Sequence, residues 1–225
     1  MNIRFSVDPC NTSTSALAIA VSESDLAFLT ETLGDTWTEI ATLEKFTGKA
    51  GKELCYPSFG QVKADRLIII GTGKGDLEGH RQAARAVGLI ARKKGIESLA
   101  YHTRESNSTL TQHIIRSISA GNYLYDRFKL KADQTSPLNE LILFAPEDNN
   151  AAQQGLGMSN ARSLARDLVN GPADVIYPES LADAARALAN DNISVEVWDE
   201  KKIKDAGMGG ITAVGQGSIV CCLCQ

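Results

Sequence analysis

The sequence lacks several features that mark specialised classes of protein. No run of about 18 apolar residues occurs, so no segment predicts a membrane-spanning helix. The first 23 residues (MNIRFSVDPCNTSTSALAIAVSE) contain one arginine and no long uninterrupted apolar stretch. This pattern is more typical of strand–turn–strand than of a signal peptide. We therefore expect a soluble, cytoplasmic protein with no membrane partner.

Basic clusters and close metal-binding pairs are also missing. The net charge is −4, and lysine and arginine are dispersed apart from short groups at Arg92–Lys94 and Lys201–Lys202. Nucleic-acid binding normally needs a basic stripe, so the composition argues against a nucleic-acid partner. The three histidines, His80, His102 and His113, lie in different segments and form no HExxH motif.

Cysteine is sparse until the last five residues. Cys10 and Cys55 are isolated, and in a cytosolic chain they are expected to be free thiols. Cys221, Cys222 and Cys224 lie together, but a zinc site usually needs a second ligand pair elsewhere, and none is present. We interpret this tail as a terminus without metal chemistry.

The chain does contain a regular alternation of strand-like and helix-like segments. Its 225 residues, 43% of them hydrophobic, suffice for one large domain, or one domain and part of another. Such alternation predicts an α/β fold with a mostly parallel sheet and helices on its faces. The expected strands are Asn2–Val7, Ala16–Val21, Tyr56–Val62, Arg66–Ile70, Ser98–His102 and Glu140–Phe144; the expected helices are Glu23–Leu33, His80–Lys94, Thr109–Phe128 and Gly157–Val169.

A glycine-rich turn, Gly71–Asp76 (GTGKGD), follows one of these strands and could in principle cradle a phosphate. The dinucleotide fingerprint GxGxxG fails because Asp76 stands where its third glycine should be. A Walker loop fails because Lys74 is followed by Gly75, and its first glycine would fall on Ile68. A tight strand-to-helix turn is the favoured interpretation, with a vestigial anion site as the alternative.

The stretch Leu164–Ser218 carries the most specific pattern. A helix stops before Pro172, and a second helix opens at Pro178 with an acidic residue after it. The remaining expected elements are an alternating strand over Ile193–Val197, a short charged helix over Asp199–Asp205 and a strand over Ile211–Val214. This order is typical of the opening of an α/β domain.

These residues resemble the M17 leucyl aminopeptidases, the cytosol aminopeptidase family. The resemblance is carried by LARDLVNGPADVIYPESLA and VEVWDEKKIKDAGMGGITAVGQGS, with weaker support from GKAGKE at Gly48–Glu53 and GNYLYDRFK at Gly121–Lys129. Asp174 departs from the family, which usually has asparagine there.

The resemblance implies three regions. Residues 1–150 would form a macro-domain-like α/β domain with a mixed sheet flanked by helices. Residues 151–171 would form a linker helix, and residues 172–225 an incomplete start of the α/β peptidase domain with an aberrant cysteine-rich tail.

The resemblance also implies a function for the family, namely hydrolytic release of N-terminal amino acids, preferentially leucine, from peptides. The family holds two divalent metal ions, manganese or zinc, and assembles as homo-hexamers. Its metal-binding and catalytic residues follow the GxGS segment, most recognisably in an NTDAEGR motif, which is absent from this sequence. We therefore expect this chain to hold neither metal and to contain no catalytic, cofactor-binding or metal-binding residue.

Two hypotheses remain open from the sequence. The chain is an inactive N-terminal fragment of a leucyl aminopeptidase, truncated or frame-shifted near Ser218, or it is a non-catalytic binding or oligomerisation module that associates with full-length subunits. The acidic cluster Asp199, Glu200 and Asp205 is the nearest alternative ligand set, and its helical spacing favours a solvated surface.

Overall fold

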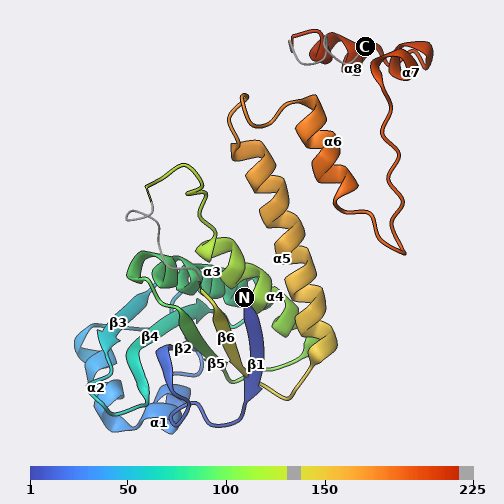
Figure 1. Cartoon of the computed structure of the whole chain (residues 1–225). Coiled ribbons are helices and arrows are strands. Elements are labelled where there is room, and N and C mark those ends of the chain that lie inside the picture. The colour runs from blue at the N-terminus through green and yellow to red at the C-terminus, as the bar shows by residue number, and fades with distance from the viewer. Residues whose placement is uncertain (131–137, 218–225) are drawn as a thin grey trace. The chain divides into compact units, whose positions relative to one another are not determined.

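The structure is a computed structural model that describes residues 1–130 and 138–217. Its internal contacts divide the chain into two units, Met1–Ser163 and Leu164–Gln225, which are treated separately below. The first unit is built on a six-stranded sheet in the order β1-β6-β5-β2-β4-β3 (Figure 1). The strands are β1 (Asn2–Ser6), β2 (Thr14–Ser22), β3 (Glu53–Pro57), β4 (Ala64–Gly73), β5 (Ser98–Thr103) and β6 (Glu140–Phe144).

The sheet is mixed, as expected for the α/β fold. β1, β6, β5, β2 and β4 are parallel, and β3 adds an antiparallel edge to β4. The central strands are continuous apolar runs because helices cover both faces of the sheet. Ala16–Val21 of β2, for example, is buried along its whole length. The predicted α/β class with a mixed sheet flanked by helices is therefore confirmed.

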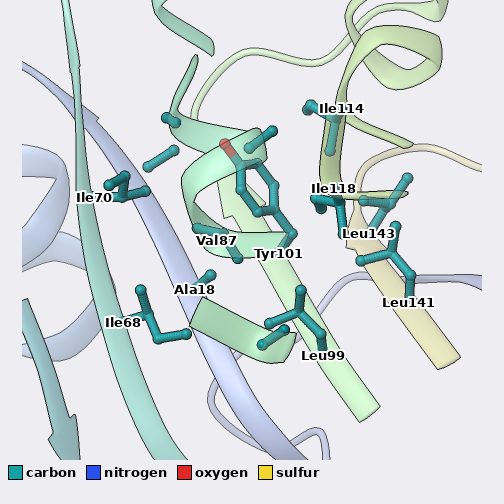
Figure 2. Close-up of a cluster of buried hydrophobic side chains, with 14 of the residues drawn as sticks. Ala18, Ile68, Ile70, Val87, Leu99, Tyr101, Ile114, Ile118, Leu141 and Leu143 are labelled. Carbon is teal, nitrogen blue, oxygen red and sulfur yellow. The ribbon is translucent and has the colours of Figure 1, made fainter. Parts of the chain in front are cut away.

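One face of the sheet is covered by α3 (Leu77–Lys94) and α4 (Ser108–Asn122) (Figure 1). Each helix begins at a side-chain cap, since Asp76 accepts from the Gly79 N–H at 2.8 Å and Asn107 accepts from the Leu110 N–H at 2.9 Å. Figure 2 shows the core beneath them, in which Tyr101 of β5 points among aliphatic side chains from both helices and four strands.

Two glycines allow α3 and α4 to pack backbone against backbone. A Cβ added at Gly88 would lie 2.1 Å from the Ile118 carbonyl oxygen, and one added at Gly121 would lie 2.1 Å from the Arg85 carbonyl oxygen. Glycine normally weakens a helix interior, so these two positions are explained by the close approach rather than by helix propensity. This contact fixes the layer that covers the first face.

The second face is covered by α1 (Ala27–Leu33) and α2 (Asp35–Leu43). Phe28 of α1 stacks on His102 of β5 with ring centroids 4.9 Å apart, and Phe144 of β6 meets the same imidazole at 5.3 Å. Burial, followed by the nearby Arg104 charge, lowers the pKa of His102 from 6.5 to about 4. The folded protein therefore favours the neutral form of the imidazole, which packs between α1 and the sheet.

The helix α5 (Asn149–Asn170) follows β6 and runs through the boundary between the two units. Its first turns belong to the first unit, where Ala151 and Ala152 are buried. Gly155 lies against Ile115 of α4, since an added Cβ would be 3.1 Å from the Ile115 side chain. The helix begins at Asn149, eight residues before the predicted start.

The second unit consists of α6 (Pro178–Arg186), α7 (Glu200–Asp205) and α8 (Gly209–Gly215) after the end of α5. Each residue from Asn160 to Gly217 is at least partly exposed. The unit therefore has amphipathic helices without a core. Within the described residues, no helix combines the length and hydropathy needed to cross a membrane.

Two predicted strands of this unit are wrong. Residues 211–214 lie in helix α8 instead, and Ile193–Val197 forms only an isolated bridge between Asn190 and Ile193. Alternation alone does not make a strand, because backbone groups of a strand need a neighbouring strand to bond. The described part of the second unit offers none.

Smaller differences concern element ends in the first unit. The helix predicted over Thr109–Phe128 ends at Asn122, because Tyr123 adopts φ −58° and ψ 131°. The helix predicted over Glu23–Leu33 begins at Ala27, with Leu26 at its N-cap. The strand predicted over Tyr56–Val62 is β3, which lies earlier and ends at Pro57. Sequence reasoning missed α2 entirely.

We predict that Gly88→Ala destabilises the protein by about 1–3 kcal/mol, because the new methyl group would overlap the Ile118 carbonyl. Urea unfolding at neutral pH measures the change. Gly157→Ala is the matched control, since Gly157 is also helical but has nothing within 4 Å of an added Cβ. The control should be neutral or up to ~1 kcal/mol more stable. Equal effects at both positions would contradict the close helix contact.

We also predict that the free energy of unfolding decreases as the pH drops, because His102 must be protonated. Its folded pKa lies below its unfolded value of 6.5, so its contribution is complete above pH 6.5 and is lost as the pH falls toward 4. Between pH 7 and 5 the loss should be on the order of 1 kcal/mol, after allowance for the partial exposure of the ring. His102→Phe keeps an aromatic ring between Phe28 and Phe144 and should flatten this part of the urea-unfolding pH profile, whereas His113→Gln should leave most of it. An unchanged profile in His102→Phe would contradict the assignment.

Candidate functional site

In an α/β sheet, a ligand site is expected at the carboxyl ends of the parallel strands. The chain leaves β2 toward β4 and leaves the neighbouring β5 toward β6, so the strand order reverses between β2 and β5. Open α/β sheets bind ligands in the crevice that such a reversal creates. Here the crevice would lie between residues 22–25 after β2 and residues 103–105 after β5.

Arg104 makes two ion pairs at this position. Its guanidinium donates from Nε and Nη2 to the Asp25 carboxylate, and Nη2 also donates to Glu31 of α1 at 2.6 Å. The Arg104 Cζ lies 4.8 Å from the centre of the Phe28 ring. The hydrogen bond to Glu31, and then that to Asp25, raises the pKa of the guanidinium. The arginine therefore ties α1 to the end of β5 where a ligand would otherwise enter.

The glycine-rich segment at the end of β4 is also committed to the fold. Gly71 and Gly73 belong to β4, so the strand runs three residues past the predicted end at Ile70 and the turn to α3 is confined to residues 74–76. The Gly71 N–H donates to the Lys52 carbonyl at 2.9 Å, and the Gly73 N–H donates to the Gly48 carbonyl at 2.8 Å. A phosphate cradle needs such N–H groups to be free. Asp76 is also engaged, as the N-cap of α3.

Three buried polar side chains lie at the same end of β4, β5 and α3. The Thr72 hydroxyl, the His80 Nδ1 and the Tyr101 hydroxyl have no hydrogen-bond partner among the described residues. Burial lowers the pKa of His80, against the opposing charges of Glu105 and Asp76, and burial raises the pKa of Tyr101. The cavity lined by Tyr101 and Glu105 measures about 10 Å³, which is the space of one water molecule rather than of a substrate.

No metal centre can be built from the described residues. Across residues 1–130 and 138–217, no group of three His, Cys, Asp or Glu side chains is close enough to hold an ion. Asp199 caps α7 by accepting from the Lys202 N–H at 2.8 Å, and Glu200 pairs with Lys204. Residues 218–225, which include Cys221, Cys222 and Cys224, lie outside the described part of the chain.

A wide opening lies within the second unit. A groove of about 970 Å³ is bordered by α6, by residues 197–200 and by α7 and α8. Its apolar lining includes Leu181, Ile211 and Val214, which are 50%, 58% and 83% exposed. Small-molecule pockets bury most of their ligand. A groove whose apolar walls are this exposed is better suited to a polypeptide surface.

Sequence reasoning missed the cluster of Arg104, Asp25, Glu31 and His102. These residues lie up to 79 positions apart and meet only because β2 and β5 are neighbours in the sheet. No local motif could have connected them.

Comparisons with known proteins match both units. The family model of the cytosol aminopeptidase N-terminal domain matches residues 18–132, and that of the catalytic domain of the same family matches residues 163–224. The probable cytosol aminopeptidase of Pseudomonas syringae pv. syringae (strain B728a) is 31% identical over 235 residues, which cover 95% of this chain and 47% of the relative. The probable cytosol aminopeptidase of Aquifex aeolicus is 31% identical, over 90% of this chain and 43% of the relative.

Two solved structures share the fold. A tomato leucine aminopeptidase mutant superposes with a TM-score of 0.76 at 20% identity, over 91% of this chain and 46% of that one. The bottromycin maturation enzyme BotP in complex with Mn gives 0.71 at 24% identity, over 92% of this chain and 43% of that one. The chain thus spans about half the length of the curated relatives that it matches. Because its N-terminal-domain match alone covers more than half of the sequence, the chain belongs to the cytosol aminopeptidase family, M17.

Proposed function

We propose that this chain is the N-terminal portion of a metal-dependent leucyl aminopeptidase, and that residues 1–225 alone do not catalyse peptide hydrolysis. The parent reaction is the release of N-terminal amino acids, preferentially leucine, from peptides. One observation carries the proposal: a member of this family has no set of metal ligands within its described residues.

The chemistry explains why that observation matters. Two divalent ions supply an activated water and polarise the scissile carbonyl, which requires about four to six converging oxygen or nitrogen ligands. Manganese or zinc would serve, and the related BotP structure contains Mn. The residues present here do not fit such a pair, because the acidic side chains around α7 are engaged in a helix cap and in surface ion pairs. We therefore assign no catalytic step to this chain.

The domain arrangement is part of the same proposal. Residues 1–150 would be the N-terminal α/β domain, residues 151–171 the linker helix, and residues 172–225 the opening of the peptidase domain. Support comes from the separate family-model matches, which cover residues 18–132 and residues 163–224. The active protein would be a cytoplasmic homo-oligomer, a hexamer, acting on peptides.

A second candidate function is a non-catalytic binding or oligomerisation module that associates with full-length subunits. The observation in its favour is that the described residues of the first unit bury a hydrophobic cluster on each face of the sheet. The coding sequence downstream of codon 218 separates the two candidates. A family ligand set in another reading frame supports a broken peptidase, whereas its absence supports the module.

We predict that purified Met1–Gln225 shows no hydrolysis of leucine p-nitroanilide with added Mn²⁺ or Zn²⁺, because residues 1–130 and 138–217 bring together no ligand group for a metal ion. A full-length family relative, assayed under the same conditions, is the positive control. Metal-stimulated turnover above the blank, removed by a chelator, would refute the inactivity of this chain.

We predict, second, that limited proteolysis cleaves Leu164–Gln225 much faster than Met1–Asn150. The reason is that each residue from Asn160 to Gly217 is at least partly exposed, whereas β2, β4 and β5 are buried. Mass spectrometry of the early fragments measures the difference. Equal resistance of both regions would show that the second unit buries its apolar faces by association.

A further inference from the structure

The surface where α3 and α4 meet gathers positively charged side chains. The two helices pack against each other, with the Arg85 carbonyl of α3 against Gly121 of α4 (Figure 1). Arg81 and Arg85 lie about one turn apart on α3, and His113 and Arg116 lie about one turn apart on α4. The charges of Arg81 and Arg116 both act on the His113 imidazole. The side chains of the two helices therefore share one surface.

The carboxylate that acts on His113 from this surface is already engaged. Glu78 accepts from the Arg81 guanidinium at 2.8 Å through one oxygen and from the Gln82 amide at 3.2 Å through the other. Arg85 and Arg116 form no ion pair with any residue of 1–130 or 138–217. Two guanidinium groups are therefore left without a counter-charge from the described chain.

The arrangement of the charges on α3 is itself unfavourable. Arg81 and Arg85 stand at positions i and i+4 of the helix, where two like charges lie close together and destabilise it. The Glu78 carboxylate neutralises Arg81 but leaves Arg85 uncompensated. An anion bound beside Arg85 would remove this repulsion.

Arg116 has a donor that the described chain leaves unsatisfied. Its Nε lies out of contact with solvent and finds no hydrogen-bond acceptor among the described residues. A charged donor that is removed from water and left unbonded is costly, and an acceptor from outside the chain would remove that cost. The side chain is half-buried rather than enclosed, so part of it remains open to such an acceptor.

We propose that Arg85 and Arg116 bind a phosphate group, either free or carried as a monoester by a small molecule. A phosphate monoester carries about −1.5 to −2 charges at pH 7, which balances two guanidinium groups, whereas a single carboxylate would balance one. The planar guanidinium donates N–H groups in pairs to phosphate oxygens, so arginine suits this ligand better than lysine does.

The extent of the charged surface favours a single phosphate group over a nucleic acid. A polynucleotide places a phosphate every few ångströms and is held by a long basic stripe. Here the unpaired positive charge is confined to Arg85 and Arg116, in a chain whose net charge is −4. The site lies within the first unit, so it stands or falls independently of the proposed peptidase function.

His113 supplies a local reporter for the experiment. Burial, followed by the charges of Arg116 and Arg81, lowers the pKa of His113 against the opposing charge of Glu78. A phosphate bound at Arg116 adds negative charge beside the imidazole and should raise its pKa. The imidazole signals of Met1–Gln225 are followed by NMR between about pH 5 and pH 8, with and without inorganic phosphate at constant ionic strength. The His113→Gln variant assigns the signal, and the pKa of His102, on the other face of the sheet, should not change.

Arginine variants test the two ligands. Arg85→Gln and Arg116→Gln should each weaken phosphate binding about tenfold, because each removes a charged hydrogen-bond donor. Arg4→Gln is the matched control, since it removes the same charge from an exposed arginine of β1 that is already paired with Glu140. It should bind phosphate as the unchanged chain does.

Urea unfolding separates phosphate binding from a merely structural role of the two arginines. Phosphate should raise the unfolding midpoint of the unchanged chain but not that of a chain carrying both Arg85→Gln and Arg116→Gln. Without phosphate, Arg85→Gln should leave the midpoint unchanged or raised, because it relieves the repulsion with Arg81. An equal loss of stability with and without phosphate would show a structural role and contradict the proposal.

Further ligands identify the source of the phosphate group. Inorganic phosphate and glycerol phosphate should both raise the pKa of His113, and the tighter of the two indicates whether the natural ligand is free or a monoester. Acetate, compared at equal ionic strength, should have little effect. An equal effect of acetate would show general screening by anions, and an unchanged His113 pKa in phosphate would exclude the site. Binding of a DNA duplex more tightly than glycerol phosphate, lost in both arginine variants, would identify a nucleic-acid surface and overturn the proposal.

Discussion

An apolar strand or helix face needs a second layer of secondary structure to cover it, and the two units of this protein meet that requirement differently. In the first unit the central strands are covered on one face by α3 and α4 and on the other by α1 and α2. In the second unit α6 and α8 keep apolar side chains in contact with solvent, with Leu181 and Ile211 at least half exposed. The first unit therefore has a buried core, whereas the apolar helix faces of the second unit remain exposed.

Because helices cover both faces of this sheet, a ligand could reach the strands of the first unit only at their ends. At the point where the strand order reverses between β2 and β5, Arg104 pairs with Asp25 and Glu31. The glycines at the end of β4 donate their N–H groups to the Gly48 and Lys52 carbonyls. These polar groups of the first unit are therefore engaged in holding the fold together. The match of residues 163–224 to the family's catalytic domain directs attention to the second unit.

The sequence predicted those parts of the fold that depend on local information. Continuous apolar runs such as Ala16–Val21 identified the central strands, and the motif-rich stretch from Leu164 identified the family. Pairing partners could not be predicted in the same way. Ile193–Val197 alternates as a strand does but has no neighbouring strand to bond, and residues 211–214 are helical in a unit whose described residues form no sheet. The contact of Arg104 with Asp25 depends on strand order, which no local pattern encodes.

Native-state hydrogen exchange of Met1–Gln225 tests most directly the claim that the first unit has a buried core and the second unit has none among its described residues. Amides of β2, β4 and β5 should exchange only through global unfolding, because these strands lie between two helical layers. Amides of α6, α7 and α8 should exchange through local opening, with protection close to that of isolated short helices. Comparable protection of α6 and β2 in the monomeric chain would contradict the account.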